Sequence, residues 1–210
     1  MTISLSDTSK RFNREWIFLN FNYTFESGIS YAVTGPNGSG KSTLLQIIAG
    51  AMVASTGRIL YSHAGRNIEQ DDVYKYISFA APYLELIEEM SVTELLIYQN
   101  KFKPFLSGVS IRQMIELAGL ENAAHKQVRY YSSGMKQRVK LIQAVFSDTP
   151  CILLDEPCTN LDEEGINLYK QLITDYCRDR LVIVSSNDPV EYEFCETRID
   201  ISMFHAKRSN

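Results

Sequence analysis

Apolar and polar residues alternate loosely along residues 3–25, where aromatic side chains are frequent. This pattern predicts two or three antiparallel strands at the start of the chain. Short apolar segments at residues 28–33, 58–61 and 76–80 predict further strands. We therefore expect the first part of the chain to be rich in β-structure.

Helical spacing dominates residues 82–147. Residues 91–94 (Ser-Val-Thr-Glu) have the form of a capping box and predict a helix that runs to about residue 101. Residues 110–113 (Ser-Ile-Arg-Gln) open a second predicted helix, which ends at Gly119. A third helix is predicted to begin beside Ser132 and to run toward residue 150. This part of the chain is expected to be a helical insertion.

Strands and helices alternate again after residue 150. The pattern predicts strands at 151–154, 181–184 and 198–203, and helices at 167–177 and 189–195. The expected fold class is α/β, with all 210 residues in a single domain. About 1–81 and 148–210 would form the α/β core, and about 82–147 a helical subdomain.

The charge pattern argues against a nucleic-acid partner. The formal net charge is −4, from 21 basic and 25 acidic residues that are interspersed, with no basic stripe or arm. The start of the chain is polar, and the longest mostly apolar stretch, residues 44–54, is too short to cross a bilayer. We expect a cytoplasmic chain that reaches a membrane only through a partner.

A phosphate-binding loop is the strongest motif in the sequence. Residues 35–43 fit the pattern G-x-x-x-x-G-K-[ST], with a predicted strand before them and a predicted helix after them. Backbone N–H groups and the positive end of that helix would face phosphate oxygens, Lys41 would reach the β- and γ-phosphates, and Ser42 would hold Mg²⁺. A glycine-rich turn without a ligand is the alternative. The loop residues are Gly35, Pro36, Asn37, Gly38, Ser39, Gly40, Lys41, Ser42 and Thr43.

A second acidic motif follows a buried strand. Four apolar residues, 151–154, are followed by Asp155 and Glu156. At the end of a strand, Asp155 could hold Mg²⁺ directly or through water, and Glu156 could orient or deprotonate the attacking water. A strand that ends in acidic residues is common, so this motif indicates a nucleotide site only together with the phosphate loop.

Over nearly its whole length the sequence resembles the nucleotide-binding domain of ATP-binding cassette (ABC) proteins. Residues 131–138 (Tyr-Ser-Ser-Gly-Met-Lys-Gln-Arg) stand where the family has its L-S-G-G-Q signature, and residues 159–162 (Thr-Asn-Leu-Asp) resemble its D-loop, with Asp162 at the dimer contact. Phe12 falls where the family places an aromatic residue that stacks on adenine, although it could be an ordinary core aromatic.

The resemblance implies a P-loop NTPase of ABC type, with a RecA-like core, an antiparallel β subdomain and an inserted helical subdomain. It also implies that two such domains, alike or different, enclose two ATP molecules head to tail. Ser132 and Gly134 at a helix start would then bind the γ-phosphate held by the other protomer. The domain would energise a separate integral membrane subunit, docked near residues 83–94, whose Glu85, Glu88 and Glu89 could also be a solvated acidic face.

Two positions depart from the family pattern. Pro82 stands where the family has a glutamine, and Asn187 stands where it has a histidine that contacts the γ-phosphate. A proline has no side-chain oxygen, and an asparagine amide cannot titrate near neutral pH. We therefore expect tight ATP binding and hydrolysis slowed on the order of 10²-fold or more.

Other functions are compatible with parts of the sequence. A degenerate, regulatory nucleotide-binding partner of a more active cassette would accommodate Pro82 and Asn187. Soluble ABC ATPases outside transport carry two cassettes or a long coiled coil, and neither is present here. A small-molecule kinase or GTPase would leave the signature-like segment unexplained, and no Asn-Lys-x-Asp guanine motif is present.

Overall fold

A computed structural model describes residues 1–205 and contains two sheets. The first sheet is antiparallel, with strand order β2-β1-β4-β5. Its long strands are rich in β-branched and aromatic residues, which fit a half-buried pleated surface. The strands are β1 (Thr2–Phe12), β2 (Glu15–Glu26), β4 (Thr56–His63) and β5 (Arg66–Ile68).

The second sheet is parallel, with strand order β6-β7-β8-β3-β9. Strands β7 and β8 are buried along their whole length, as the continuous apolar runs predict. The strands are β3 (Ser30–Thr34), β6 (Ile77–Ala80), β7 (Cys151–Asp155), β8 (Leu181–Ser185) and β9 (Thr197–Asp200).

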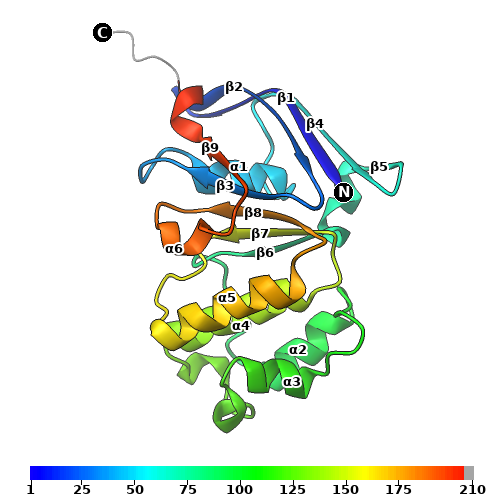
Figure 1. Cartoon of the computed structure of the whole chain (residues 1–210), viewed down its shortest axis with the longest axis vertical. Helices are drawn as coiled ribbons and strands as arrows, with labels where there is room; N and C mark the ends of the chain where they lie inside the picture. Colours follow the sequence, from blue (N-terminus) through cyan, green and yellow to red (C-terminus); the bar gives the residue numbers. More distant parts are fainter. Residues whose placement is uncertain (206–210) are drawn as a thin grey trace.

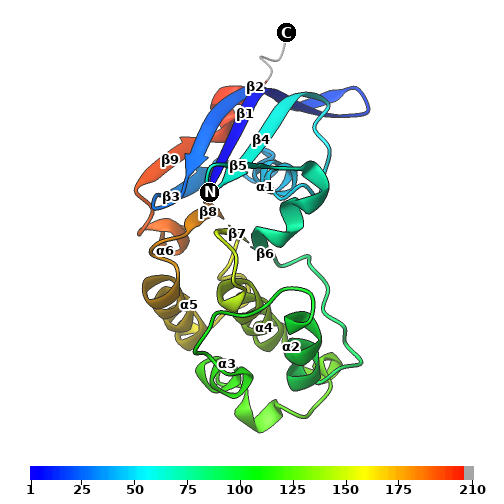
Figure 2. The same cartoon turned by 90° about the vertical axis from the view of Figure 1, so that its right-hand side faces the viewer.

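Helices cover both faces of the parallel sheet, and each face has its own core. Helix α1 (Lys41–Ile48) packs between the two sheets, whereas α4 (Ser133–Phe146) and α5 (Glu163–Tyr176) pack against the opposite face (Figures 1 and 2). Successive strand residues alternate between the cores: Leu153 faces the α1 side and Leu154 the α4 side. Helix α1 and the start of α4 therefore belong to different sides of the sheet.

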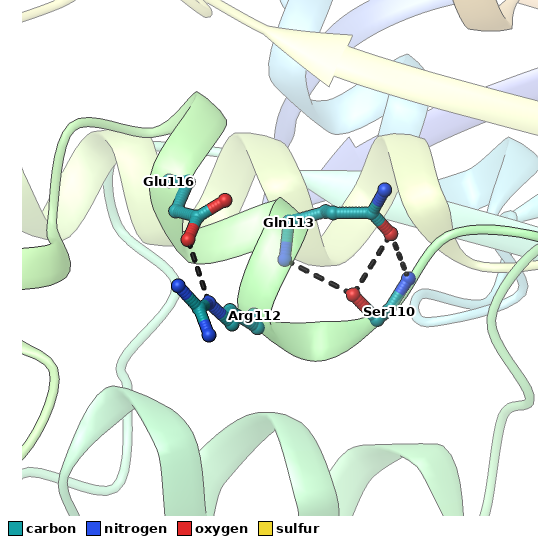
Figure 3. A network of polar contacts seen from close by, with 4 residues as sticks. All are labelled: Ser110, Arg112, Gln113 and Glu116. Atoms are coloured by element: carbon teal, nitrogen blue, oxygen red, sulfur yellow. Dashed lines mark hydrogen bonds and ion pairs between the residues drawn. The ribbon is translucent and has the colours of Figure 1, made fainter.

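Two short helices lie beyond α4 in Figure 1, and their starts are fixed locally. Helix α2 (Val92–Asn100) begins at the capping box of Ser91 with Glu94, and α3 (Ile111–Leu117) at that of Ser110 with Gln113. Figure 3 shows the second box, in which the Ser110 hydroxyl accepts from the Gln113 N–H at 3.2 Å. Each box satisfies N–H groups that would otherwise have no helical partner.

The structure corrects several predicted boundaries. The last predicted strand ends early, because the Asp200 carboxylate accepts from the Ser202 N–H and starts a 3-10 helix at Ile201–Phe204. Helix α5 begins at Glu163 rather than at 167, capped by Asp162, and the last α-helix, α6 (Pro189–Tyr192), is a single turn. Strand β5 was not predicted. Within residues 1–205, no helix has the length and apolar character to span a bilayer.

Candidate functional site

The predicted phosphate loop connects β3 to the start of α1. Its glycines allow a turn that other residues rarely adopt, with φ of 79° at Gly38 and 93° at Gly40. A Cβ on Gly40 would lie 2.4 Å from the Cγ2 atom of Ile17 in β2. Glycine is therefore required at residue 40 both by backbone conformation and by the close approach of the antiparallel sheet.

Lys41 is the first residue of α1, and its side chain folds back over the loop. The ammonium donates to the carbonyl oxygens of Gly35 at 2.7 Å and Pro36 at 3.3 Å, and the residue is 5% exposed. Burial lowers the pKa of Lys41, while the carboxylates of Glu156 and Asp155 act in the opposite direction. The structure thus brings the lysine of the loop and the two carboxylates after β7 into one electrostatic environment.

Asp155 ends β7 and is 1% exposed. Its Oδ2 atom accepts a hydrogen bond from the Tyr83 hydroxyl at 3.0 Å, whereas its Oδ1 atom is buried without a hydrogen-bond partner among residues 1–205. A buried carboxylate oxygen without a partner is costly, and a hard cation would satisfy it. Together with the half-buried Ser42 hydroxyl on α1, Asp155 offers the oxygen ligands that suit Mg²⁺.

Glu156 follows in a left-handed backbone conformation, with φ of 42°. Its N–H donates to the Ser185 carbonyl of β8 at 2.8 Å, which holds the chain at the edge of the sheet as it turns away from β7. A non-glycine residue with positive φ is uncommon and is found where the surrounding structure imposes it. The backbone therefore fixes the position beside Asp155 from which the half-buried Glu156 side chain extends.

Asn187 lies just beyond the end of β8 and contacts the phosphate loop directly. Its Nδ2 atom donates to Oδ1 of Asn37 at 2.9 Å. The structure therefore places Asn187 beside the loop, where the sequence predicts a phosphate contact.

The signature-like segment forms the start of α4. The Ser132 hydroxyl caps the helix by accepting from the Met135 N–H at 3.2 Å, and Ser132 itself is exposed. A Cβ on Gly134 would lie 2.8 Å from the Asn160 carbonyl oxygen, so only glycine permits this close contact with the D-loop-like segment. Gly134 therefore has a packing role that the sequence did not reveal.

Further contacts join α4 to the segment that leads into α5. Arg138 pairs with Oδ1 of Asp162 at 2.7 Å, and the Gln137 side chain donates to the Pro157 carbonyl at 2.8 Å. The N–H of Gly165 and Arg138 both lower the pKa of Asp162, the backbone hydrogen bond being the larger cause. Direct contacts thus join residues 157–162 to the first half of α4.

Phe12 lies at the end of β1, in the sheet that packs over the phosphate loop. Its ring is 44% exposed, and the Lys10 ammonium lies 4.9 Å from the ring centroid. This exposure excludes the interpretation that Phe12 is an ordinary core aromatic.

Sequence reasoning missed Tyr83, the residue that contacts Asp155. Its position directly after Pro82 was the available signal, since that segment follows β6 and β6 is the neighbour of β7 in the sheet. Within residues 1–205, no group of three or more His, Cys, Asp or Glu side chains is arranged to hold a metal ion. Any metal at this site would depend on few protein ligands.

Comparison with known proteins agrees with this geometry. A family model described as ABC transporter matches residues 18–159. The uncharacterized ABC transporter ATP-binding protein YybJ of Bacillus subtilis is 33% identical over 159 residues, which cover 72% of this chain and 69% of YybJ. The cytochrome c biogenesis ATP-binding export protein CcmA of Mesorhizobium japonicum is 28% identical over 192 residues, 90% of this chain and 92% of CcmA.

The fold has close structural relatives. The dimeric structure of MJ0796, a bacterial ABC transporter cassette, has a TM-score of 0.76 and 24% identity, and the match covers 95% of this chain and 94% of MJ0796. The two sheets, the intervening helix and the phosphate loop described above are thus those of an ABC ATPase cassette. The chain belongs to the family of ABC transporter ATP-binding proteins, which are nucleotide-binding ATPases.

Proposed function

We propose that this chain is the subunit of an ABC transporter that binds and hydrolyses ATP with Mg²⁺ and energises a separate integral membrane subunit. The observation that carries this proposal is the buried Oδ1 atom of Asp155 at the end of β7, which has no hydrogen-bond partner among residues 1–205 and shares the electrostatic environment of Lys41 of the phosphate loop. In ordinary globular cores such an oxygen is paired. Here a metal-bound polyphosphate would satisfy both the carboxylate and the ammonium.

Each site residue then has one role. Backbone N–H groups of Gly35, Asn37, Gly38, Ser39, Gly40 and Thr43 surround the phosphates, and Lys41 contacts their β and γ oxygens. Pro36 belongs to the same loop but has no backbone N–H to donate. Ser42 and Asp155 would hold Mg²⁺, which would neutralise charge on the phosphates. Glu156 orients and deprotonates the attacking water, Asn187 donates to the γ-phosphate, and Phe12 stacks on adenine.

The second half of the site comes from another cassette, of the same or a different kind. Ser132 and Gly134 begin α4, on the face of the sheet opposite to α1, so one chain does not bring them onto its own phosphate loop by local packing. Head-to-tail pairing would supply them, with Asp162 at the contact, and the similar cassette MJ0796 is dimeric. Through the membrane subunit the dimer lies on the cytoplasmic face of a membrane.

We further propose that hydrolysis is slow, because Pro82 and Asn187 replace the family's glutamine and histidine. The same replacements suit a regulatory partner of a more active cassette, which is the second candidate function. The two candidates differ in whether the chain hydrolyses ATP as a homodimer.

The experiment is equilibrium binding of ATP to the purified chain, with and without Mg²⁺, followed by light scattering and phosphate release. Lys41→Ala should remove binding, whereas Lys101→Ala, at an exposed lysine of the helical region, should leave it intact. Saturating ATP should double the molar mass of Glu156→Gln. Absence of ATP binding by the wild type would overturn the transporter proposal, and a membrane protein that co-purifies with the chain would support it.

A further inference from the structure

Tyr83 makes a contact with Asp155 that Pro82 cannot make. Its hydroxyl donates to Oδ2 of Asp155 at 3.0 Å, although the residue as a whole is 47% exposed. The side chain therefore reaches from the protein surface to a carboxylate that is 1% exposed. Its position is directly after the residue that replaces the family's glutamine.

We propose that Tyr83 is a positioning residue that orients the Asp155 carboxylate toward Mg²⁺. This inference rests on the proposed function, since it concerns the same metal site. The Tyr83 hydroxyl would thus supply a polar group beside the metal ligand. The sequence predicts no such group here, because Pro82 replaces the family's glutamine.

The two oxygens of Asp155 have different surroundings, and Tyr83 creates the difference. Oδ2 is occupied by the hydroxyl, while Oδ1 has no hydrogen-bond partner within residues 1–205. With Oδ2 occupied, rotation of the carboxylate would break its hydrogen bond, so Oδ1 is the oxygen left for a cation. Partners that fix a ligating carboxylate in this way typically change metal affinity by about 10- to 100-fold.

The tyrosine is itself held in place. Its ring packs edge-on against Phe79 of β6, with ring centroids 6.4 Å apart.

The test compares Tyr83→Phe with Tyr74→Phe, a matched control at a tyrosine that is 57% exposed. Binding of adenylyl-imidodiphosphate is measured at equilibrium over a range of Mg²⁺ concentrations and again in EDTA, and bound Mn²⁺ is followed by electron paramagnetic resonance. Tyr83→Phe should raise the Mg²⁺ concentration at half-saturation about 10-fold or more. Its nucleotide affinity in EDTA and its melting temperature should match those of the wild type and of Tyr74→Phe.

Three results would overturn the assignment. The first is an unchanged Mg²⁺ requirement in Tyr83→Phe. The second is an equal loss of binding with Mg²⁺ and in EDTA, together with a lower melting temperature, which would show a structural role. In both cases normal binding by the wild type would leave the proposed function intact. The third, no effect of Mg²⁺ on nucleotide binding by the wild type, would overturn the proposed function as well.

Discussion

The side-chain amide of Asn187 donates a hydrogen bond of 2.9 Å to the side-chain oxygen of Asn37, and so joins the end of β8 to the phosphate loop. Both residues are exposed, so the contact lies at the protein surface. An amide that is already oriented toward the loop can transfer its donor to a phosphate oxygen with little movement. The same amide cannot gain or lose a proton near neutral pH.

Replacing Asn187 tests whether this position limits turnover. Asn187→His adds an imidazole that can donate to phosphate in either protonation state, and we expect phosphate release to rise about 10-fold or more. The gain should vary with pH around 6.5, the ordinary imidazole pKa. Asn187→Ala, the matched control, should be slower than the wild type. If histidine and alanine give the same rate, residue 187 does not act on the phosphate.

Glu156→Gln should separate binding from hydrolysis. The substitution keeps the shape of the side chain, which starts from a left-handed backbone position, but removes its capacity to accept a proton. We expect phosphate release to fall about 10²- to 10⁴-fold. ATP affinity, measured by equilibrium binding in EDTA, should stay close to that of the wild type. Turnover at the wild-type rate would exclude Glu156 as the base.

Arg180 should make a large contribution to stability. The residue is 9% exposed, and its guanidinium donates to the carbonyls of Val145 at 2.5 Å, Ser147 at 2.7 Å and Thr149 at 2.7 Å. These groups lie at and just beyond the last turn of α4, where a positive charge is favourable. Arg180→Met would remove these hydrogen bonds, although the Ser147 carbonyl would keep the one it accepts from the Thr149 N–H. The loss should lower the free energy of unfolding by about 2–4 kcal/mol.

The measurement is urea unfolding followed by circular dichroism. Arg178→Met provides the control, because Arg178 is exposed and lies two positions earlier in the chain. Its effect should stay within about 0.5 kcal/mol. Similar losses in both variants would mean that the carbonyl contacts of Arg180 contribute little to stability.

Glu191 should make the stability of the protein depend on pH. The residue is 4% exposed and accepts from the Cys158 N–H at 2.6 Å. Burial is the main cause that raises the pKa of Glu191 above its ordinary value of 4.5, and hydrogen bonds from Ser186 and Cys158 oppose it. Because the folded-state pKa is raised, the stabilising contribution is fully present below 4.5 and is lost as pH rises through the folded-state value.

Glu191→Gln removes this titration and keeps an oxygen to accept from Cys158. The difference in unfolding free energy, variant minus wild type, should therefore increase from pH 4 to pH 7, as measured by urea titrations at each pH. Glu193→Gln, at an exposed carboxylate on the same segment, is the matched control. A flat difference for Glu191→Gln would contradict the raised pKa.

Local signals explain why much of the architecture could be predicted. Ser91 and Ser110 mark the starts of their helices, because each forms a capping box with the residue three positions later. The structure contains both boxes. The apolar run before Asp155 likewise predicts a strand that is buried on both faces, and β7 is buried along its whole length. The 3-10 helix that begins at Ile201 was missed because the Asp200 cap competes with continued strand pairing.

Contacts between distant segments were beyond the reach of the sequence. Tyr83 and Asp155 are separated by 72 positions, and their contact depends on the order of β6 and β7 in the sheet. The contact of Gly134 with the Asn160 carbonyl depends in the same way on how α4 packs beside the segment before α5. Such contacts follow from tertiary packing, for which residue type and spacing give no local signal.

The close fit between Gly40 and Ile17 leaves no clearance between the antiparallel sheet and the phosphate loop. Phe12 belongs to that same sheet, so one sheet carries both the exposed aromatic ring and the side chain that packs against the turn. In the proposed function, this sheet sets the spacing between the base and the phosphates of a bound nucleotide. A molecule whose two ends are spaced differently would have to give up one of these contacts.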